Sequence, residues 1–152
     1  YMIQVIVIGI VSLPIQLLMM QTEFNNINLF SLVGVMICIL GIVIESIADH
    51  QMTKFKAKPN NKGKLMNKGL WQYSRHPNYF GDSMFWWGIF LFSYGYTSNL
   101  MMAISPIIMT YFLIKVSGVS LLERQIKHKK EGYEEYINNT SAFILMPKKN
   151  KK

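Results

Sequence analysis

Long uncharged apolar runs alternate with short polar segments along this chain. Met2–Met20 and Leu29–Ile44 contain no Asp, Glu, Lys or Arg, and buried helices of soluble proteins rarely stay uncharged for that long. A helix needs about 20 apolar residues to cross the hydrocarbon core of a bilayer. We therefore predict an all-α, multi-span transmembrane helix bundle, with four spans at about Met2–Met20, Leu29–Ala48, Tyr79–Tyr96 and Leu100–Ser117.

Prolines and one aspartate qualify this pattern. Pro14 and Pro106 fall inside predicted spans, where neighbouring helices can satisfy the backbone groups that a proline frees. Asp82 makes the third span the most costly to place in lipid. The length of 152 residues is that of one modest domain. We predict a single transmembrane domain over residues 1–147 and a basic tail over residues 148–152.

Basic residues predict the topology. None of the 16 Lys and Arg residues precedes Lys54; 15 of them lie in the linker 54–75 or in the tail from Arg124 onward. The opposite loops, 21–28 and 97–99, have none. Basic loops stay in the cytoplasm, so we predict an integral multi-pass protein with the linker and the C-terminus cytoplasmic. This rule also explains the net charge of +8, so we expect no nucleic-acid partner.

The first predicted span and the single cysteine each allow a competing interpretation. The first span lacks the basic start and the small-residue cleavage site of a signal peptide, so a membrane helix is favoured. The single Cys38 supports neither a disulfide nor a metal site. After the fourth span, Leu121, Leu122 and Ile126 predict an amphipathic C-terminal helix on the membrane surface.

The densest polar chemistry is GLWQYSRHPNYFGD, Gly69 to Asp82, at the start of the third span. His76 precedes Pro77 and is therefore disfavoured in a helix, so the new helix should begin near Pro77 or Asn78. A helix N-terminus attracts anions. An aspartate there could merely complement the helix dipole, but the crowding of Arg75, His76 and Asn78 beside it favours a functional site.

Three other groups of polar residues are candidates or alternatives. Glu45 and Asp49 share one face of the second span, where ionisable residues are functional candidates by default; Asp49 alone could simply end the helix. The linker lysines are mostly explained by topology, but could also bind a phosphate.

Trp71 and Tyr73 are typical interface anchors, and Tyr133 and Tyr136 share a helix face. No Rossmann or Walker glycine motif and no metal-ligand spacing occurs.

The run GLWQYSRHPNYFGD, followed by an aromatic-rich span and by SGVSLLERQIKHKKEGYEEYINNTSAFILMPKK, resembles the DUF1295 family. This family is a branch of the steroid 5-alpha-reductase-like membrane proteins. The resemblance covers nearly the whole chain, and the first span resembles a middle helix of a longer family member, so N-terminal spans are expected to be missing. It implies a reductase that passes hydride from NADPH to the carbon–carbon double bond of a steroid-like or other lipid enone, with membrane lipids as its surroundings.

The resemblance also implies cofactor-binding roles for particular residues. Asp49 matches a cofactor-binding aspartate, Glu45 stands where the reductases often have asparagine, and Lys56 and Lys64 replace arginines. Asn78 and Asp82 match residues at the nicotinamide end. The remaining candidates around the cofactor are Tyr73, Arg75, His76, Tyr79 and Glu123, with Arg124 and Tyr133 as weaker ones. The catalytic residue is not assigned, because the reductases take theirs from N-terminal helices that this chain does not contain.

Two alternatives stay open. Arg75-His76-Pro77 with Tyr79 and Gly81 also resembles isoprenylcysteine carboxyl methyltransferases, which bind S-adenosylmethionine with this segment and a later glutamate, for which Glu123 is available. A non-catalytic membrane scaffold is the third possibility. The Asn-Tyr-Phe-Gly-Asp continuation, the C-terminal Ser-Ala-Phe segment and the linker lysines favour the reductase and a phosphate-rich cofactor.

Overall fold

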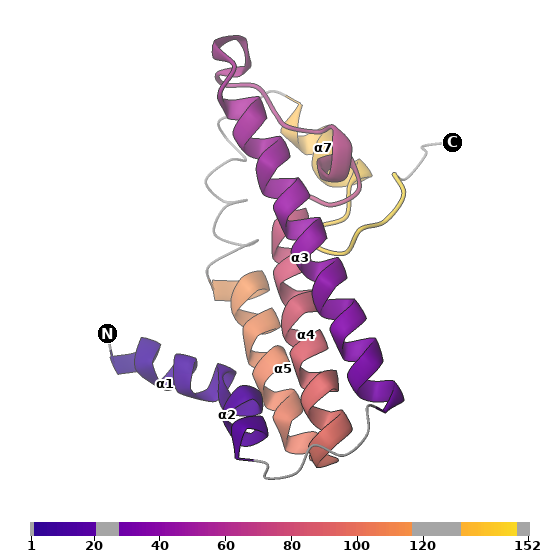
Figure 1. Cartoon of the computed structure of the whole chain (residues 1–152). Coiled ribbons are helices and arrows are strands. Elements are labelled where there is room, and N and C mark those ends of the chain that lie inside the picture. The colour runs from indigo at the N-terminus through magenta and orange to yellow at the C-terminus, as the bar shows by residue number, and fades with distance from the viewer. Residues whose placement is uncertain (1, 21–27, 117–131, 149–152) are drawn as a thin grey trace. The chain divides into compact units, whose positions relative to one another are not determined.

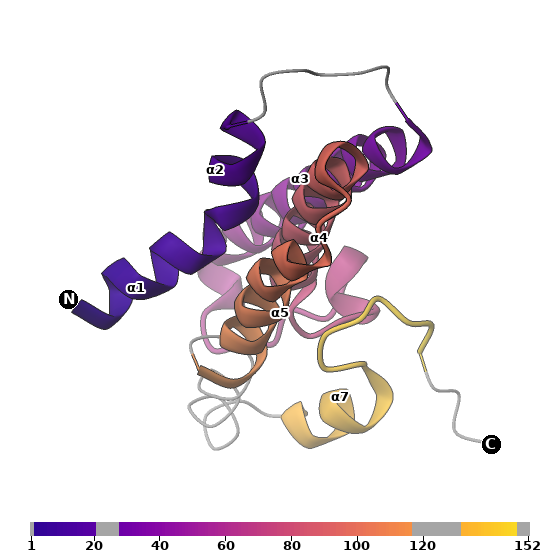
Figure 2. The ribbon, with the colours of Figure 1, turned by 90° about the horizontal axis from the view of Figure 1, so that it is seen from below.

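The computed structural model describes residues 2–20, 28–116 and 132–148. Regular structure in these ranges is helical and includes six α-helices; one isolated parallel bridge pairs Ser74 with Ser141. The predicted all-α class is thus confirmed (Figures 1 and 2). The α-helices are α1 (Met2–Val11), α2 (Leu13–Met19), α3 (Leu29–Lys56), α4 (Pro77–Thr97), α5 (Ile104–Tyr111) and α7 (Tyr133–Asn139). Short helical turns are η1 (Pro59–Asn61), η2 (Gly69–Gln72), η3 (Leu100–Ala103) and the π-helical η4 (Phe112–Val116).

The first predicted span consists of two short helices, α1 and α2, which meet at Ser12. Pro14 has no N–H, and its ring clashes with the carbonyl of the residue four positions earlier, which disfavours an unbroken helix here. The Ser12 carbonyl instead accepts from the N–H groups of Ile15 at 3.0 Å and Gln16 at 3.1 Å. The chain therefore changes helix beside the proline, whereas the sequence pattern predicts one span that continues through Pro14.

Helix α3 is, within the described residues, the one that is both long and apolar enough to cross a membrane. It runs eight residues beyond the predicted end at Ala48, because no helix breaker occurs before Pro59 and because Lys54 and Lys56 suit the negative end of the helix dipole. Large apolar side chains stay exposed along it, among them Phe30, Met36, Ile39, Leu40, Ile42 and Val43. The count of four spans stays a prediction.

Backbone contacts divide the chain into two compact units. The first unit comprises residues 1–42 and 83–111, and the second comprises residues 43–82 and 112–152. Helices α3 and α4 each contribute residues to both units. The prediction of a single domain over residues 1–147 stays a prediction.

Small residues bring α3 and α4 together in the first unit. A Cβ atom built on Gly88 would lie 2.7 Å from both the Cys38 backbone nitrogen and the Gly34 carbonyl oxygen. Near the other end of the contact, the Asn28 side-chain amide donates to the Gly95 carbonyl. Close backbone approach through small residues is typical of helix pairs in membranes.

Hydroxyl groups link the other helices of the first unit. Ser105 of α5 donates to the Val11 carbonyl at 2.6 Å, and α1 packs against α5. Ser83 of α4 and Thr110 of α5 are hydrogen-bonded at 2.8 Å, and Trp87 Nε1 donates to the same threonine at 3.2 Å. Such side-chain hydrogen bonds join helices where water is excluded.

The core of the second unit is built around Trp71. Its indole packs with Ala48 and Met66, and its Nε1 donates to the Ala48 carbonyl at 3.0 Å. Gln51 fixes the preceding turn, because its Oε1 accepts from the Leu70 N–H at 2.9 Å. The prediction that Trp71 is an interface anchor is therefore wrong: the residue is 8% exposed, and it holds η2 against α3.

Candidate functional site

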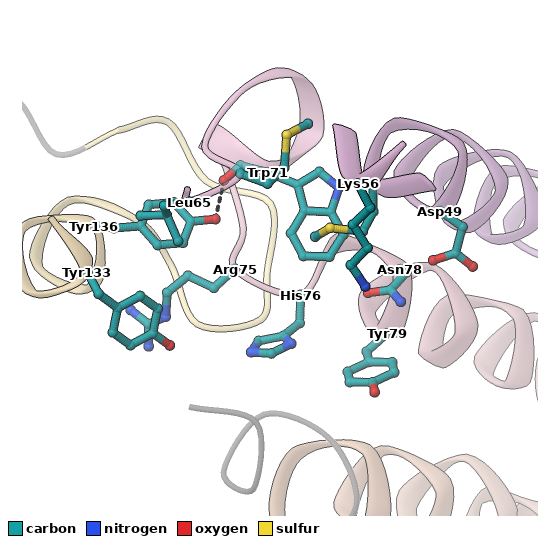
Figure 3. Close-up of a pocket in the computed structure, with 12 residues that line it drawn as sticks. Asp49, Lys56, Leu65, Trp71, Arg75, His76, Asn78, Tyr79, Tyr133 and Tyr136 are labelled. Atoms are coloured by element: carbon teal, nitrogen blue, oxygen red, sulfur yellow. Dashed lines mark hydrogen bonds between the residues drawn. The ribbon is translucent and has the colours of Figure 1, made fainter. Parts of the chain in front are cut away.

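The second unit contains a pocket of about 400 Å³, within the range of about 300–1,000 Å³ that is usual for ligand sites. It lies beside the last turns of α3, the turn η2, the start of α4 and the helix α7 (Figure 3). Its lining residues are Asp49, Met52, Lys56, Leu65, Met66, Trp71, Arg75, His76, Asn78, Tyr79, Tyr133 and Tyr136. The pocket therefore combines an apolar lining with a few polar and charged groups.

Aromatic rings form much of the pocket wall. His76 and Tyr79 are stacked, with ring centroids 5.6 Å apart and planes 1° from parallel. On the side of α7, Tyr133 and Tyr136 are both buried and their centroids lie 6.3 Å apart. The prediction that these two tyrosines share a face is confirmed. Flat rings on several sides suit a ligand that carries a planar ring system.

The chain between η2 and α4 is held in place by the C-terminal segment. Arg75 N–H donates to the Ser141 carbonyl at 2.9 Å, and Met146 N–H donates to the Tyr73 carbonyl at 3.1 Å. The Ser74 hydroxyl donates to the Phe143 carbonyl at 2.7 Å. These bonds fix the segment that presents His76 to the pocket.

Helix α4 begins at Pro77, as predicted. A proline suits the first helical position, where its missing N–H would have no helical partner. The His76 N–H donates to the Ser74 hydroxyl at 3.1 Å, and the Phe80 N–H donates to the His76 carbonyl at 3.1 Å. The first turn of α4 then presents Asn78 and Tyr79 to the pocket.

Arg75 joins the pocket to α7. Its Nη1 donates to the carbonyls of Ile137 and Thr140, both at 2.9 Å. Carbonyls at a helix C-terminus lack helical partners, so a guanidinium there satisfies them and offsets the negative end of the helix dipole. The guanidinium thus has a structural role at the pocket edge, in addition to its predicted place near a cofactor.

Asn78 carries a polar atom for which the described residues provide no hydrogen-bond partner. Its Oδ1 is buried and accepts no hydrogen bond from the described residues. A buried acceptor without a donor costs about 1–3 kcal/mol, so native proteins seldom keep one unless a ligand or water completes it. Within this pocket the atom is suited to accept a hydrogen bond from a ligand N–H.

The structure brings six of the predicted site residues together. These are Asp49, Lys56, Arg75, His76, Asn78 and Tyr79, and all of them line the pocket. Tyr133, a weaker candidate, lines it too. The polar cluster of the sequence is thus a wall of one pocket, although its binding roles stay predictions.

Four candidates among the described residues do not line this pocket: Glu45, Lys64, Tyr73 and Asp82. Glu45 lies close enough to Asp49 and Asp82 for their carboxylates to repel one another. Tyr73 is exposed, and Lys64 lies on the loop beyond α3. Glu123 lies outside the described residues.

The structure also places residues in the pocket that the sequence analysis did not count as site residues. Met52, Leu65 and Met66 supply its apolar lining, and Trp71 and Tyr136 supply further rings. The spacing of Tyr133 and Tyr136, which puts both on one helix face, could have identified Tyr136 as a pocket residue. Nothing local in the sequence places Trp71 against Ala48, since the two are 23 residues apart.

The polar groups of the pocket suit a ligand with a planar ring, an amide and negative charge. Asn78 offers an acceptor, Lys56 offers a cation, and His76 and Tyr79 offer stacked rings. No group of three or more His, Cys, Asp or Glu side chains with metal-site geometry occurs in the described part of the chain.

A family model described as a protein of unknown function, DUF1295, matches residues 1–140. The chain belongs to the DUF1295 family. A search of the curated proteins and of the solved structures finds no match. The DUF1295 match includes every residue that lines the pocket, whereas Ser141, Phe143 and Met146, which brace the segment before α4, lie beyond it.

Proposed function

We propose that this DUF1295 protein is a membrane-embedded, NADPH-dependent reductase of a carbon–carbon double bond in a steroid-like or other lipid enone. The observation that carries the proposal is the buried Oδ1 of Asn78, which has no donor among the described residues and belongs to a pocket lined by aromatic rings and cations. The carboxamide of a nicotinamide ring presents an N–H group of the kind that this atom lacks.

The membrane location is supported by the surface of α3. Ile39 is 56% exposed and Leu40 is 51% exposed, and both lie in the uncharged stretch Leu29–Ile44 of this helix. Exposed contiguous apolar surface of this extent marks a membrane or protein contact. The close glycine contact between α3 and α4 is of the kind found in bilayers. We propose four spans, with the basic linker and the C-terminus cytoplasmic.

The pocket residues fit the proposed cofactor. Asn78 would bind the carboxamide, and His76 and Tyr79 would stack on a planar ring. Lys56 would neutralise phosphate charge, and Asp49 would accept hydrogen bonds from ribose hydroxyls. Lys64 does not line this pocket and would act on the phosphates from the loop beyond α3. The chemistry that such a group supplies when bound is hydride transfer. The apolar lining by Met52, Leu65 and Met66 excludes water from the ring.

A second candidate function is S-adenosylmethionine-dependent methyl transfer. It is favoured by the rings of Trp71, Tyr79, Tyr133 and Tyr136, because aromatic faces attract a sulfonium cation. Arg75 would be less available to a ligand carboxylate in this case, since its Nη1 donates to two carbonyls of α7. The Asn78 Oδ1, which has no donor among the described residues, and Lys56 in the pocket favour the reductase.

A thermal-shift titration of the detergent-purified protein with NADPH, NADH and S-adenosylmethionine tests the proposal. A ligand that binds only the native state at 100 times its dissociation constant stabilises it by about 2.7 kcal/mol. We expect a shift with NADPH that Asn78→Ala abolishes. Asn60→Ala is the matched control, because Asn60 is exposed and lines no pocket described here.

The alternatives give different results in the same titration. A shift with S-adenosylmethionine alone would replace the reductase with a methyltransferase. A wild-type protein that is folded and shifts with none of the three ligands would support a non-catalytic scaffold. An NADPH shift that survives in Asn78→Ala would remove this residue from the cofactor site.

A further inference from the structure

The loop after α3 gathers lysines around a second pocket. This lysine loop, residues 56–64, turns back at η1 just beyond the end of α3 (Figure 1). Together with Met52 and Phe55 of α3 it encloses about 380 Å³. Four lysines line this space: Lys56, Lys58, Lys62 and Lys64.

Hydrogen bonds hold the lysine loop in a defined turn. The Asn61 side-chain amide donates to the Phe55 carbonyl at 2.9 Å, which satisfies a carbonyl at the C-terminus of α3. The Lys64 N–H donates to the Asn61 carbonyl at 2.9 Å. Gly63 has a φ of +79°, a conformation that glycine adopts without strain. The lysines therefore project from a folded turn whose shape is fixed by Asn61 and Gly63.

The charge of this surface is of one sign. All four lysines are exposed, and the sequence has no Asp or Glu between His50 and Gly81. A third pocket, of about 350 Å³, continues the surface and is lined by Lys58, Lys64 and Lys68. Like charges brought together in this way create a positive potential that attracts anions.

We propose that the lysine loop binds the headgroup phosphate of an anionic phospholipid at the membrane surface. This rests on the proposed membrane location, since the loop directly follows the apolar helix α3. Clusters of Lys and Arg immediately cytoplasmic of a membrane helix bind anionic lipids, with about 1 kcal/mol for each basic residue near the surface.

The composition of the loop pocket favours a lipid over a soluble anion. Phe55 and Met52 give it an apolar floor beside the lysines, which suits the glycerol and first acyl carbons below a headgroup phosphate. Its cations are lysines, and a lysine binds as a point charge, without the two-pronged fork of arginine. Such a site favours a negatively charged headgroup at the membrane surface over a single small anion.

Two lysines can be removed without touching the pocket beside Asn78. Lys58 and Lys62 line the loop pocket and not the cofactor pocket, whereas Lys56 lines both. The test variant is therefore Lys58→Gln/Lys62→Gln. The matched control is Lys54→Gln/Lys148→Gln, which removes the same charge from two exposed lysines that line no pocket described here.

Native mass spectrometry of the detergent-purified full chain would measure bound phosphatidylglycerol against phosphatidylcholine. We expect the wild type to retain phosphatidylglycerol preferentially, and Lys58→Gln/Lys62→Gln to bind it about thirtyfold more weakly, as two lost lysines imply. The control should bind as the wild type does. Equal loss in both double variants would overturn the proposal, because the attraction would then come from net charge alone.

Two more arms separate the lipid from soluble ligands. If pyrophosphate displaces the lipid from the wild type and binds as tightly as the lipid does, the proposal is overturned in favour of a soluble anion. A thermal shift with NADPH should survive in Lys58→Gln/Lys62→Gln, and its loss there would make the loop part of the cofactor site. Absence of an NADPH shift in the wild type, with lysine-dependent lipid binding intact, would contradict the reductase and support the lipid site.

Discussion

Gly34 of α3 and Gly88 of α4 face each other across a contact between the two helices. A Cβ atom on either glycine would lie 2.7 Å from the carbonyl oxygen of the other. Real Cβ atoms do not come so close to backbone oxygens, so a side chain at either position requires the helices to separate. The contact is thus made by backbone, a kind of packing that is typical of helix pairs in membranes.

Gly88→Ala should destabilise the first unit by about 1–3 kcal/mol, the usual cost of overpacking a close contact. The added methyl group would meet the backbone of Gly34 and Cys38, which cannot rotate away. Thermal unfolding of the purified protein, followed by circular dichroism, measures the change.

Gly9→Ala is the control for this substitution. Gly9 also lies in a helix, and a Cβ there meets nothing within 4 Å. Its replacement should be neutral or stabilising, by up to about 1 kcal/mol, because alanine has the higher helix propensity. Equal destabilisation by both variants would contradict the backbone contact described here.

Local features of the sequence predicted where α3 and α4 begin. The uncharged run from Leu29 predicted α3, and Pro77 predicted the start of α4, because an apolar run and a proline restrict the backbone wherever they occur. The break between α1 and α2 was missed, although Pro14 marks it, because a proline inside a membrane helix can be tolerated or can end the helix.

Contacts between residues far apart in the sequence could not be predicted from local sequence patterns. Asn78 and His76 were identified as candidates from their crowding beside a helix start, and both line the pocket. Trp71 contacts Ala48, which is 23 positions away in the sequence. Arg75 donates to Ile137 of α7, which is 62 positions away. Which distant carbonyl an indole or a guanidinium meets depends on the whole fold, so Trp71 was misassigned to the membrane interface.

Tyr136→Phe should destabilise the second unit by about 1–3 kcal/mol. The Tyr136 hydroxyl donates to the Trp71 carbonyl and lies 3.4 Å from the Ser74 carbonyl, in a buried position. Removing the hydroxyl leaves the buried Trp71 and Ser74 carbonyls without this donor. The loss of their hydration on folding is then no longer compensated by a hydrogen bond. Chemical denaturation followed by tryptophan fluorescence measures the loss.

Tyr73→Phe is the matched control, because Tyr73 is 41% exposed and water can replace any partner of its hydroxyl. It should change the free energy of unfolding little, as surface substitutions usually do. A Tyr136→Phe protein as stable as this control would mean that the hydroxyl does not join α7 to η2.

Arg75→Ala should release the C-terminal segment more than it lowers global stability. The variant loses the donor to the carbonyls of Ile137 and Thr140, while the backbone bond to Ser141 stays possible. Charged hydrogen bonds of this kind contribute about 1.5–3 kcal/mol each. We expect faster amide hydrogen exchange over residues 137–146, measured by mass spectrometry.

Lys148→Ala provides the comparison for Arg75→Ala, since it removes an exposed cation from the same end of the chain. Its exchange pattern should match that of the wild type. Faster exchange throughout α3 in Arg75→Ala would instead indicate that the arginine supports the whole second unit.

Asn78→Ala should affect stability and ligand binding in opposite directions. The Asn78 Oδ1 is buried without a donor among the described residues, so removing it relieves a desolvation cost and should leave the melting temperature of the ligand-free protein unchanged or higher. Residues kept for binding commonly lower stability in this way. In the presence of saturating NADPH, the same variant should melt below the wild type, because the stabilisation from the ligand is lost. Melting temperatures of both proteins, with and without NADPH, measure the two effects. A ligand-free variant that melts well below the wild type would show that Asn78 is a structural residue with a partner in the folded protein.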